Sequence, residues 1–70
     1  MLSKTKTLEI LESFSKECLR FWLAQGKSNE EAHEGMIRDI KDLKHNPYVP
    51  CGEAIDLAVR NEFIKKLGGA

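Results

Sequence analysis

Cys51 holds the most favourable position in this chain for nucleophilic chemistry. It follows a proline, precedes a glycine and lies near an expected helix N-terminus, a location where reactive cysteines are often found. A cysteine nucleophile needs a base, and the sequence has two histidines, His33 and His45. Because His45 belongs to the outer side of the preceding helix, we interpret Cys51 as a packing residue of the loop. Cys18 lies in the middle of an apolar arc and is expected in the core.

His33 falls on the apolar side of the expected second helix, close to Ile37 and Ile40. A histidine in this position could contact a ligand or respond to pH. The more common arrangement places it at the core margin, with one ring nitrogen bonded to a backbone carbonyl or to water. No second metal ligand occurs at a usable spacing, so the sequence predicts neither a metal site nor a cofactor.

A short basic stretch with an aromatic residue occupies the end of the second helix and the loop after it. Such a combination can hold a phosphate or stack on a base. Acidic residues interleave with it, however, and alternating signs are typical of a solvated helix face, which is the interpretation we favour. Tyr48 stays a candidate ligand contact, together with His33 and Arg60. The stretch consists of Arg38, Lys41, Lys44, His45 and Tyr48.

Asp56 and Arg60 form an i,i+4 acid–base pair in the order that supports a helix. They lie between two apolar stripes of the expected third helix, one with Phe63 and the other with Ile64. An arginine anchored by a carboxylate is common at protein interfaces, whereas an exposed pair adds only about 0.3–0.5 kcal/mol of stability. Both interpretations stay open, and a ligand site between subunits is a third. The candidate interface residues are Phe21, Trp22, Asp56, Arg60, Phe63 and Ile64.

The elements that must position these residues are helical. Along residues 8–23, at 100° per residue, the polar side chains fall within about 100° of one another and the apolar ones spread over roughly 220°. One flank of a surface helix needs about half that apolar width, so this helix must be covered from more than one side. The third helix also presents two apolar sides. Self-association is the simplest remedy, with Phe21 and Trp22 supplying a large apolar area.

Local signals indicate where the helices begin and end. Thr5 or Thr7 is the expected N-cap of the first helix, and Gly26 ends it because glycine adopts a left-handed conformation at low cost. Residues 28–31 predict a capping box. Gly35 lies inside the second helix at a cost of about 1 kcal/mol relative to alanine, where another backbone could approach closely. The predicted helices span about 6–25, 29–44 and 51–67, and the first two form an antiparallel hairpin.

Length and charge restrict the class of protein. The 70 residues make one domain, and a chain of this size buries only about 60% of the surface that its unfolded form exposes. Basic and acidic residues number 11 each, whereas nucleic-acid binders usually carry a basic excess. The N-terminal residues lack the apolar segment of a secretory signal, and no apolar run approaches the roughly 18 residues of a membrane span. We expect a reduced, cytoplasmic protein.

These observations predict a single all-α domain, a small three-helix bundle that self-associates as a homodimer or higher oligomer. The expected function is a non-enzymatic interaction or regulatory module, an adaptor or inhibitor of another protein, as is common among small accessory proteins of bacteria and their phages. Two alternatives stay open: a helix-turn-helix-like DNA-binding regulator, and an oligomer that sequesters a nucleotide or small molecule. The predicted core consists of Leu11, Phe14, Cys18, Trp22, Met36, Ile40, Leu43, Leu57, Val59 and Phe63.

Overall fold

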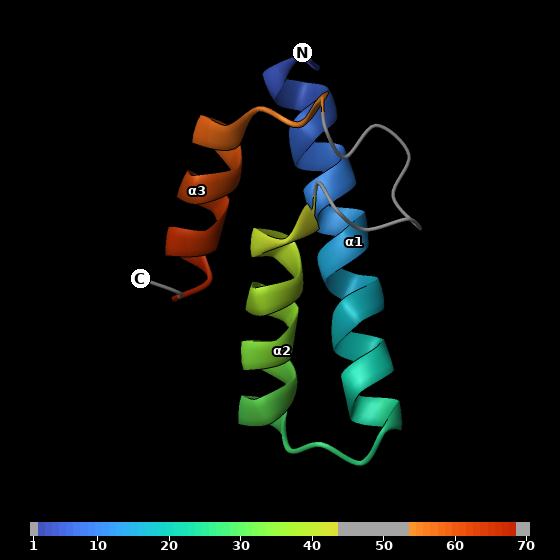
Figure 1. The fold of residues 1–70 in the computed structure, drawn as a ribbon. Coiled ribbons are helices and arrows are strands. Elements are labelled where there is room, and N and C mark those ends of the chain that lie inside the picture. The colour runs from blue at the N-terminus through green and yellow to red at the C-terminus, as the bar shows by residue number, and fades with distance from the viewer. Residues whose placement is uncertain (1, 44–53, 69–70) are drawn as a thin grey trace.

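The computed structural model describes residues 2–43 and 54–68, and this part of the chain contains three helices and no strand. α1 spans Lys4–Ala24, α2 spans Asn29–Lys41 and α3 spans Leu57–Lys66. α1 and α2 form an antiparallel hairpin, and α3 packs beside them and runs in the same direction as α1 (Figure 1). The predicted all-α bundle is therefore confirmed.

α1 begins earlier than its threonines predict. The N-cap is Ser3, whose Oγ accepts a hydrogen bond from the backbone N–H of Lys6 at 3.2 Å. Neither threonine caps the helix, and Thr7 is fully buried. The expected end is confirmed: Gly26 has a φ of 86°, and its N–H donates to the carbonyl of Leu23 at 3.0 Å. Glycine thus makes the sharp turn that starts the hairpin.

α2 begins with the predicted capping box. Ser28 Oγ accepts a hydrogen bond from the Glu31 N–H at 3.2 Å, and Glu31 Oε1 accepts one from the Ser28 N–H at 3.3 Å. The bonds with Ser28 lower the pKa of the Glu31 carboxyl, because they favour its charged form. The start of α2 is therefore fixed by side chains only three positions apart.

The lowered pKa of Glu31 predicts a pH dependence of stability. Its contribution is present above the usual glutamate pKa of about 4.3 and is lost as the pH falls through the lower pKa of the folded state. In Glu31→Gln the amide oxygen preserves the box but does not titrate. We expect urea unfolding to show wild type more stable than Glu31→Gln near neutral pH, with the gap closing in acid. An equal gap at both pH values would contradict this role, and Glu30→Gln serves as the control.

α3 begins later than the predicted residue 51. Residues 51–53 lie outside the described part of the chain, but residues 54–56 are not α-helical, so the prediction is wrong for them. The N-cap is Asp56, whose Oδ1 accepts hydrogen bonds from the N–H groups of Ala58 and Val59 at 3.0 and 3.3 Å. An aspartate is a favoured N-cap, so the helix starts where this carboxylate can satisfy its first free N–H groups.

The connection between α2 and α3 does not have the geometry of a helix-turn-helix motif. That motif joins its helices by a turn of 3–4 residues, whereas α2 ends at Lys41 and α3 begins at Leu57. The chain returns to the start of α1 before α3, because the Leu2 N–H donates to the Ala54 carbonyl at 2.8 Å. The spacing of these helices gives the DNA-binding alternative no support.

The core lies between the three helices. Six of the ten predicted core residues are buried, and Phe14, Trp22 and Phe63 are half-buried against them. The prediction for Leu57 is wrong, since it is 52% exposed. α3 instead directs Ile64, which is 4% exposed, into the core, and Leu57 lies beyond the edge of the packed face. The buried apolar residues are Leu11, Cys18, Ala32, Met36, Ile40, Leu43, Ile55, Val59 and Ile64.

Candidate functional site

The sequence left open whether Asp56 and Arg60 form an interface pair or an exposed pair. In the structure their side chains do not pair, and the Arg60 N–H donates to the Asp56 carbonyl at 2.9 Å as part of the helix. Asp56 caps α3, while Arg60 reaches the end of α2, where its Nη1 donates to the Lys41 carbonyl at 2.9 Å. Its Nη2 donates to Asn61 Oδ1 at 3.1 Å. A cation is favoured at the electronegative C-terminal end of a helix, so Arg60 stabilises the end of α2. The predicted i,i+4 pair is therefore wrong, and both side chains have roles within the chain.

His33 makes the complementary contact, from α2 to the end of α3. Its Nε2 lies 2.6 Å from the carbonyl oxygen of Leu67, the C-cap residue of α3. Because a carbonyl can only accept, Nε2 must carry the hydrogen. The prediction that His33 packs at the core margin with one ring nitrogen on a backbone carbonyl is confirmed. α2 and α3 thus each receive a hydrogen bond at their C-terminal end from a basic side chain of the other.

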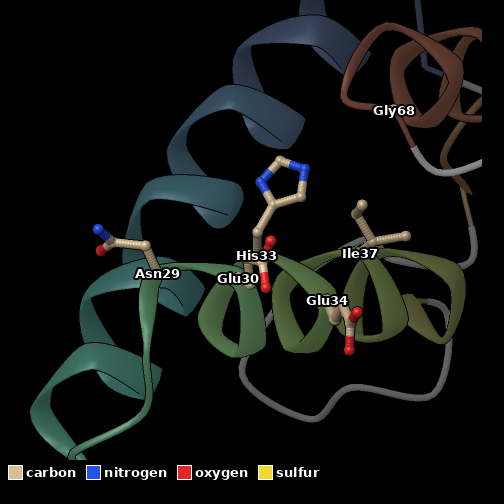
Figure 2. Close-up of a pocket in the computed structure, with 6 residues that line it drawn as sticks. All are labelled: Asn29, Glu30, His33, Glu34, Ile37 and Gly68. Atoms are coloured by element: carbon tan, nitrogen blue, oxygen red, sulfur yellow. The ribbon is translucent and has the colours of Figure 1, made fainter.

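The hollow beside His33 has a volume of about 640 Å³ and lies between one flank of α2 and the end of α3. Figure 2 shows His33 and Ile37 on the side of α2 that faces the other helices, with Gly68 across from them. Glu30 and Glu34 make its polar lining acidic, and Asn29 completes it. In the described residues no three metal-binding side chains come together. With Nε2 already bonded to α3, His33 offers a ligand only its Nδ1.

Trp22 is anchored inside the hairpin. Its Nε1 donates to Asp39 Oδ2 at 3.0 Å, and its ring covers the buried Gly35, where an added Cβ would lie 2.7 Å from the indole nitrogen. The missing side chain of Gly35 therefore makes room for the Trp22 ring of α1. The sequence had indicated that another backbone could approach closely at this position. Phe21, at 5.2 Å between ring centroids, meets Trp22 edge to face and is 55% exposed. Of the two aromatic interface candidates, Phe21 is the one that faces solvent.

Cys18 is a core residue, as the sequence predicts. Burial raises the pKa of its thiol to about 12, and the nearby Asp39 carboxylate adds to the shift by disfavouring a second negative charge. The thiolate is the reactive form, so Cys18 is not a nucleophile at neutral pH. Cys51, His45 and Tyr48 lie outside the described residues.

A second hollow, of about 310 Å³, runs between α1 and α3, and we call it the α1–α3 groove. Its floor is apolar and consists of Leu8, Val59, Phe63 and Leu67. Its rim is charged and exposed, and consists of Lys4, Glu12, Glu62 and Lys66. An apolar centre within a polar rim is the usual layout of a protein-binding surface.

The predicted interface residues differ in how accessible they are to a partner. Ile64 is buried in the core of the single chain and offers little surface to a partner. Phe63 lines the α1–α3 groove and Phe21 is exposed, so both are available to a partner. Sequence reasoning missed Leu8 as a groove residue, although it belongs to the wide apolar arc of the first helix. The sequence did not identify the charged residues of the rim, because the packing of the helices decides which of them flank a groove.

None of the helices in the described part of the chain is both long and apolar enough to cross a membrane. Comparisons of this chain with protein-family models, with curated proteins and with solved structures found no match.

Proposed function

We propose that this protein is a small non-enzymatic interaction module, an adaptor or inhibitor that acts by binding a protein partner in the α1–α3 groove. The observation that carries the proposal is the groove itself, with Phe63 half-buried in an apolar floor between two charged rims. Such a groove suits the apolar face of a helix, which is a recurring mode of recognition between proteins.

The polar side chains best suited to catalysis or ligand binding already make hydrogen bonds within the chain, which supports a non-enzymatic role. His33 and Arg60 bond to the C-terminal ends of neighbouring helices, and Trp22 bonds to Asp39. Asp56 is committed to the first N–H groups of α3. Among the described residues these side-chain contacts hold the helices together, and they leave the exposed α1–α3 groove available for recognition.

Photo-crosslinking tests the proposal. We expect a benzophenone amino acid in place of Glu62, on the groove rim, to form a protein adduct in cells, because a bound partner would lie against it. The matched control is the same substitution at Glu17, which is exposed on α1 outside the groove. Adding Phe63→Ala should reduce the adduct severalfold, since it removes part of the apolar floor. No adduct at position 62, or the same adducts at both positions, would contradict the proposal.

A further inference from the structure

The charges on the rim of the α1–α3 groove alternate in sign. α1 contributes Lys4 and Glu12, and α3 contributes Glu62 and Lys66. The two helices run in the same direction (Figure 1), and their beginnings are held close by the bond from the Leu2 N–H to the Ala54 carbonyl. Along α1, Lys4 therefore lies nearer this shared end than Glu12, and along α3, Glu62 lies nearer it than Lys66. Each lysine has a glutamate both across the groove and farther along its own helix.

These four charges are not paired with one another within the chain. In residues 2–43 and 54–68, the ion pairs within 4.0 Å are Lys6–Glu9 at 3.8 Å and Arg20–Glu17 at 3.7 Å, and neither involves the rim. The rim residues are also exposed. Among the described residues, no ion pair has to break before these four charges pair with a second surface.

We propose that a second copy of this chain occupies the α1–α3 groove and forms a two-fold symmetric dimer, an inference that rests on the proposed function. A two-fold interface brings one surface patch onto itself, so the patch must be complementary to itself. The rim carries two positive and two negative charges in alternation, and a two-fold axis that runs along the groove or across it places each lysine on a glutamate. A uniformly acidic or basic partner would instead meet two like charges, which opposes binding.

Two arrangements satisfy this symmetry. If the axis runs along the groove, α1 of one copy faces α3 of the other, so Glu12 meets Lys66 and Lys4 meets Glu62. If the axis runs across the groove, each helix faces its own counterpart, so Glu12 meets Lys4 and Glu62 meets Lys66. In both arrangements the two rims meet, and Phe63 and its neighbours on the floor face the floor of the partner copy.

Charge-reversal variants test the proposal by their solution mass over a range of concentrations. Each contact occurs twice in a two-fold dimer, so Glu12→Lys creates two pairs of like charge at the interface. We expect the dissociation constant of the dimer to rise about tenfold. Adding Lys66→Glu restores dimerisation if α1 faces α3, whereas adding Lys4→Glu restores it if α1 faces α1. Glu17→Lys makes the same change in charge outside the groove and should leave the dissociation constant within about twofold. Circular dichroism of each variant checks that the helices remain.

The second-copy inference is overturned if neither double variant reverses the weaker dimerisation of Glu12→Lys. It is also overturned if Glu17→Lys weakens dimerisation equally. A wild-type protein that stays monomeric would do the same. The photo-crosslinking experiment separates this failure from failure of the proposed function. An adduct at position 62 with a different protein, from a monomeric chain, would refute the dimer and support the interaction module. The dimer predicts instead an adduct of twice the chain mass.

Discussion

Replacing Trp22 by alanine is expected to lower the free energy of unfolding by about 3 kcal/mol, the low end of the range for a truncated core tryptophan. The indole covers Gly35 and donates to Asp39 at 3.0 Å, so Trp22→Ala opens a cavity in the hairpin and leaves a half-buried carboxylate without this donor. Such a loss is a large part of the stability of a small domain. Urea unfolding followed by circular dichroism measures it.

Phe21→Ala is the matched control, since Phe21 is the next aromatic residue along the same helix and is 55% exposed. It should cost at most about 1 kcal/mol, mainly from the lost edge contact with the Trp22 ring. The order of these two effects distinguishes a structural tryptophan from an interface tryptophan. If Phe21→Ala destabilised the chain as much as Trp22→Ala, the packing described for the hairpin would be incorrect.

Gly35→Ala is expected to have opposite effects in two backgrounds. Helix propensity alone favours alanine over glycine by about 1 kcal/mol. In the wild type, however, the new Cβ would lie 2.7 Å from Trp22 Nε1 and 2.8 Å from Cε2, so the ring must move. We expect a net loss of about 1–3 kcal/mol, the usual cost of overpacking. In Trp22→Ala the obstacle is gone, and the same substitution should stabilise the helix by about 1 kcal/mol.

A double-mutant cycle on Trp22 and Gly35 provides the measurement, because contacting residues show large coupling energies. We would measure the free energy of unfolding of the wild type, the two single variants and the double variant. These four values give the sign of the Gly35→Ala effect in each background. If Gly35→Ala changed stability equally in both backgrounds, the ring and the glycine would not be in contact.

The features that sequence reasoning predicted correctly depend on residues close together in the chain. Gly26 ends α1 and Ser28 with Glu31 starts α2, because each of these signals requires atoms no more than a few positions apart. The amphipathic pattern likewise predicted that Cys18 and Ile40 are buried. His33 was assigned to the core margin with a backbone acceptor, although the carbonyl that accepts from it lies 34 positions away.

The incorrect predictions concern α3, where two explanations of the same residues competed. Asp56 lies four positions before Arg60, which is the spacing of an ion pair on a helix. The same aspartate is also a good N-cap, and its carboxylate accepts from the free N–H groups at the start of α3 instead of pairing with Arg60. Once Asp56 starts the helix, Arg60 is free to reach the end of α2. Which side of α3 is buried depends on where α1 and α2 lie, and this placement exchanged the expected positions of Leu57 and Ile64.

The structure also changes which residues account for the excess apolar surface. The wide apolar arc of the first helix predicted cover from more than one side, and α2 and α3 both pack against α1. What remains outside is the floor of the α1–α3 groove, the exposed Phe21 and Leu23 near the end of α1, and Leu57 at the start of α3. The groove and the Phe21 surface lie on different parts of α1, so experiments can tell which of them a partner covers.

An NMR dilution series on the wild-type chain tests the central claim, that the protein binds its partner copy through the α1–α3 groove. Amide signals report the surroundings of each residue, so a contact that forms with concentration shifts only the residues near it. We expect concentration-dependent shifts clustered in residues 4–12 and 59–67, with little change around Phe21. Spectra that do not change with concentration, or shifts confined to the end of α1 that carries Phe21, would contradict it.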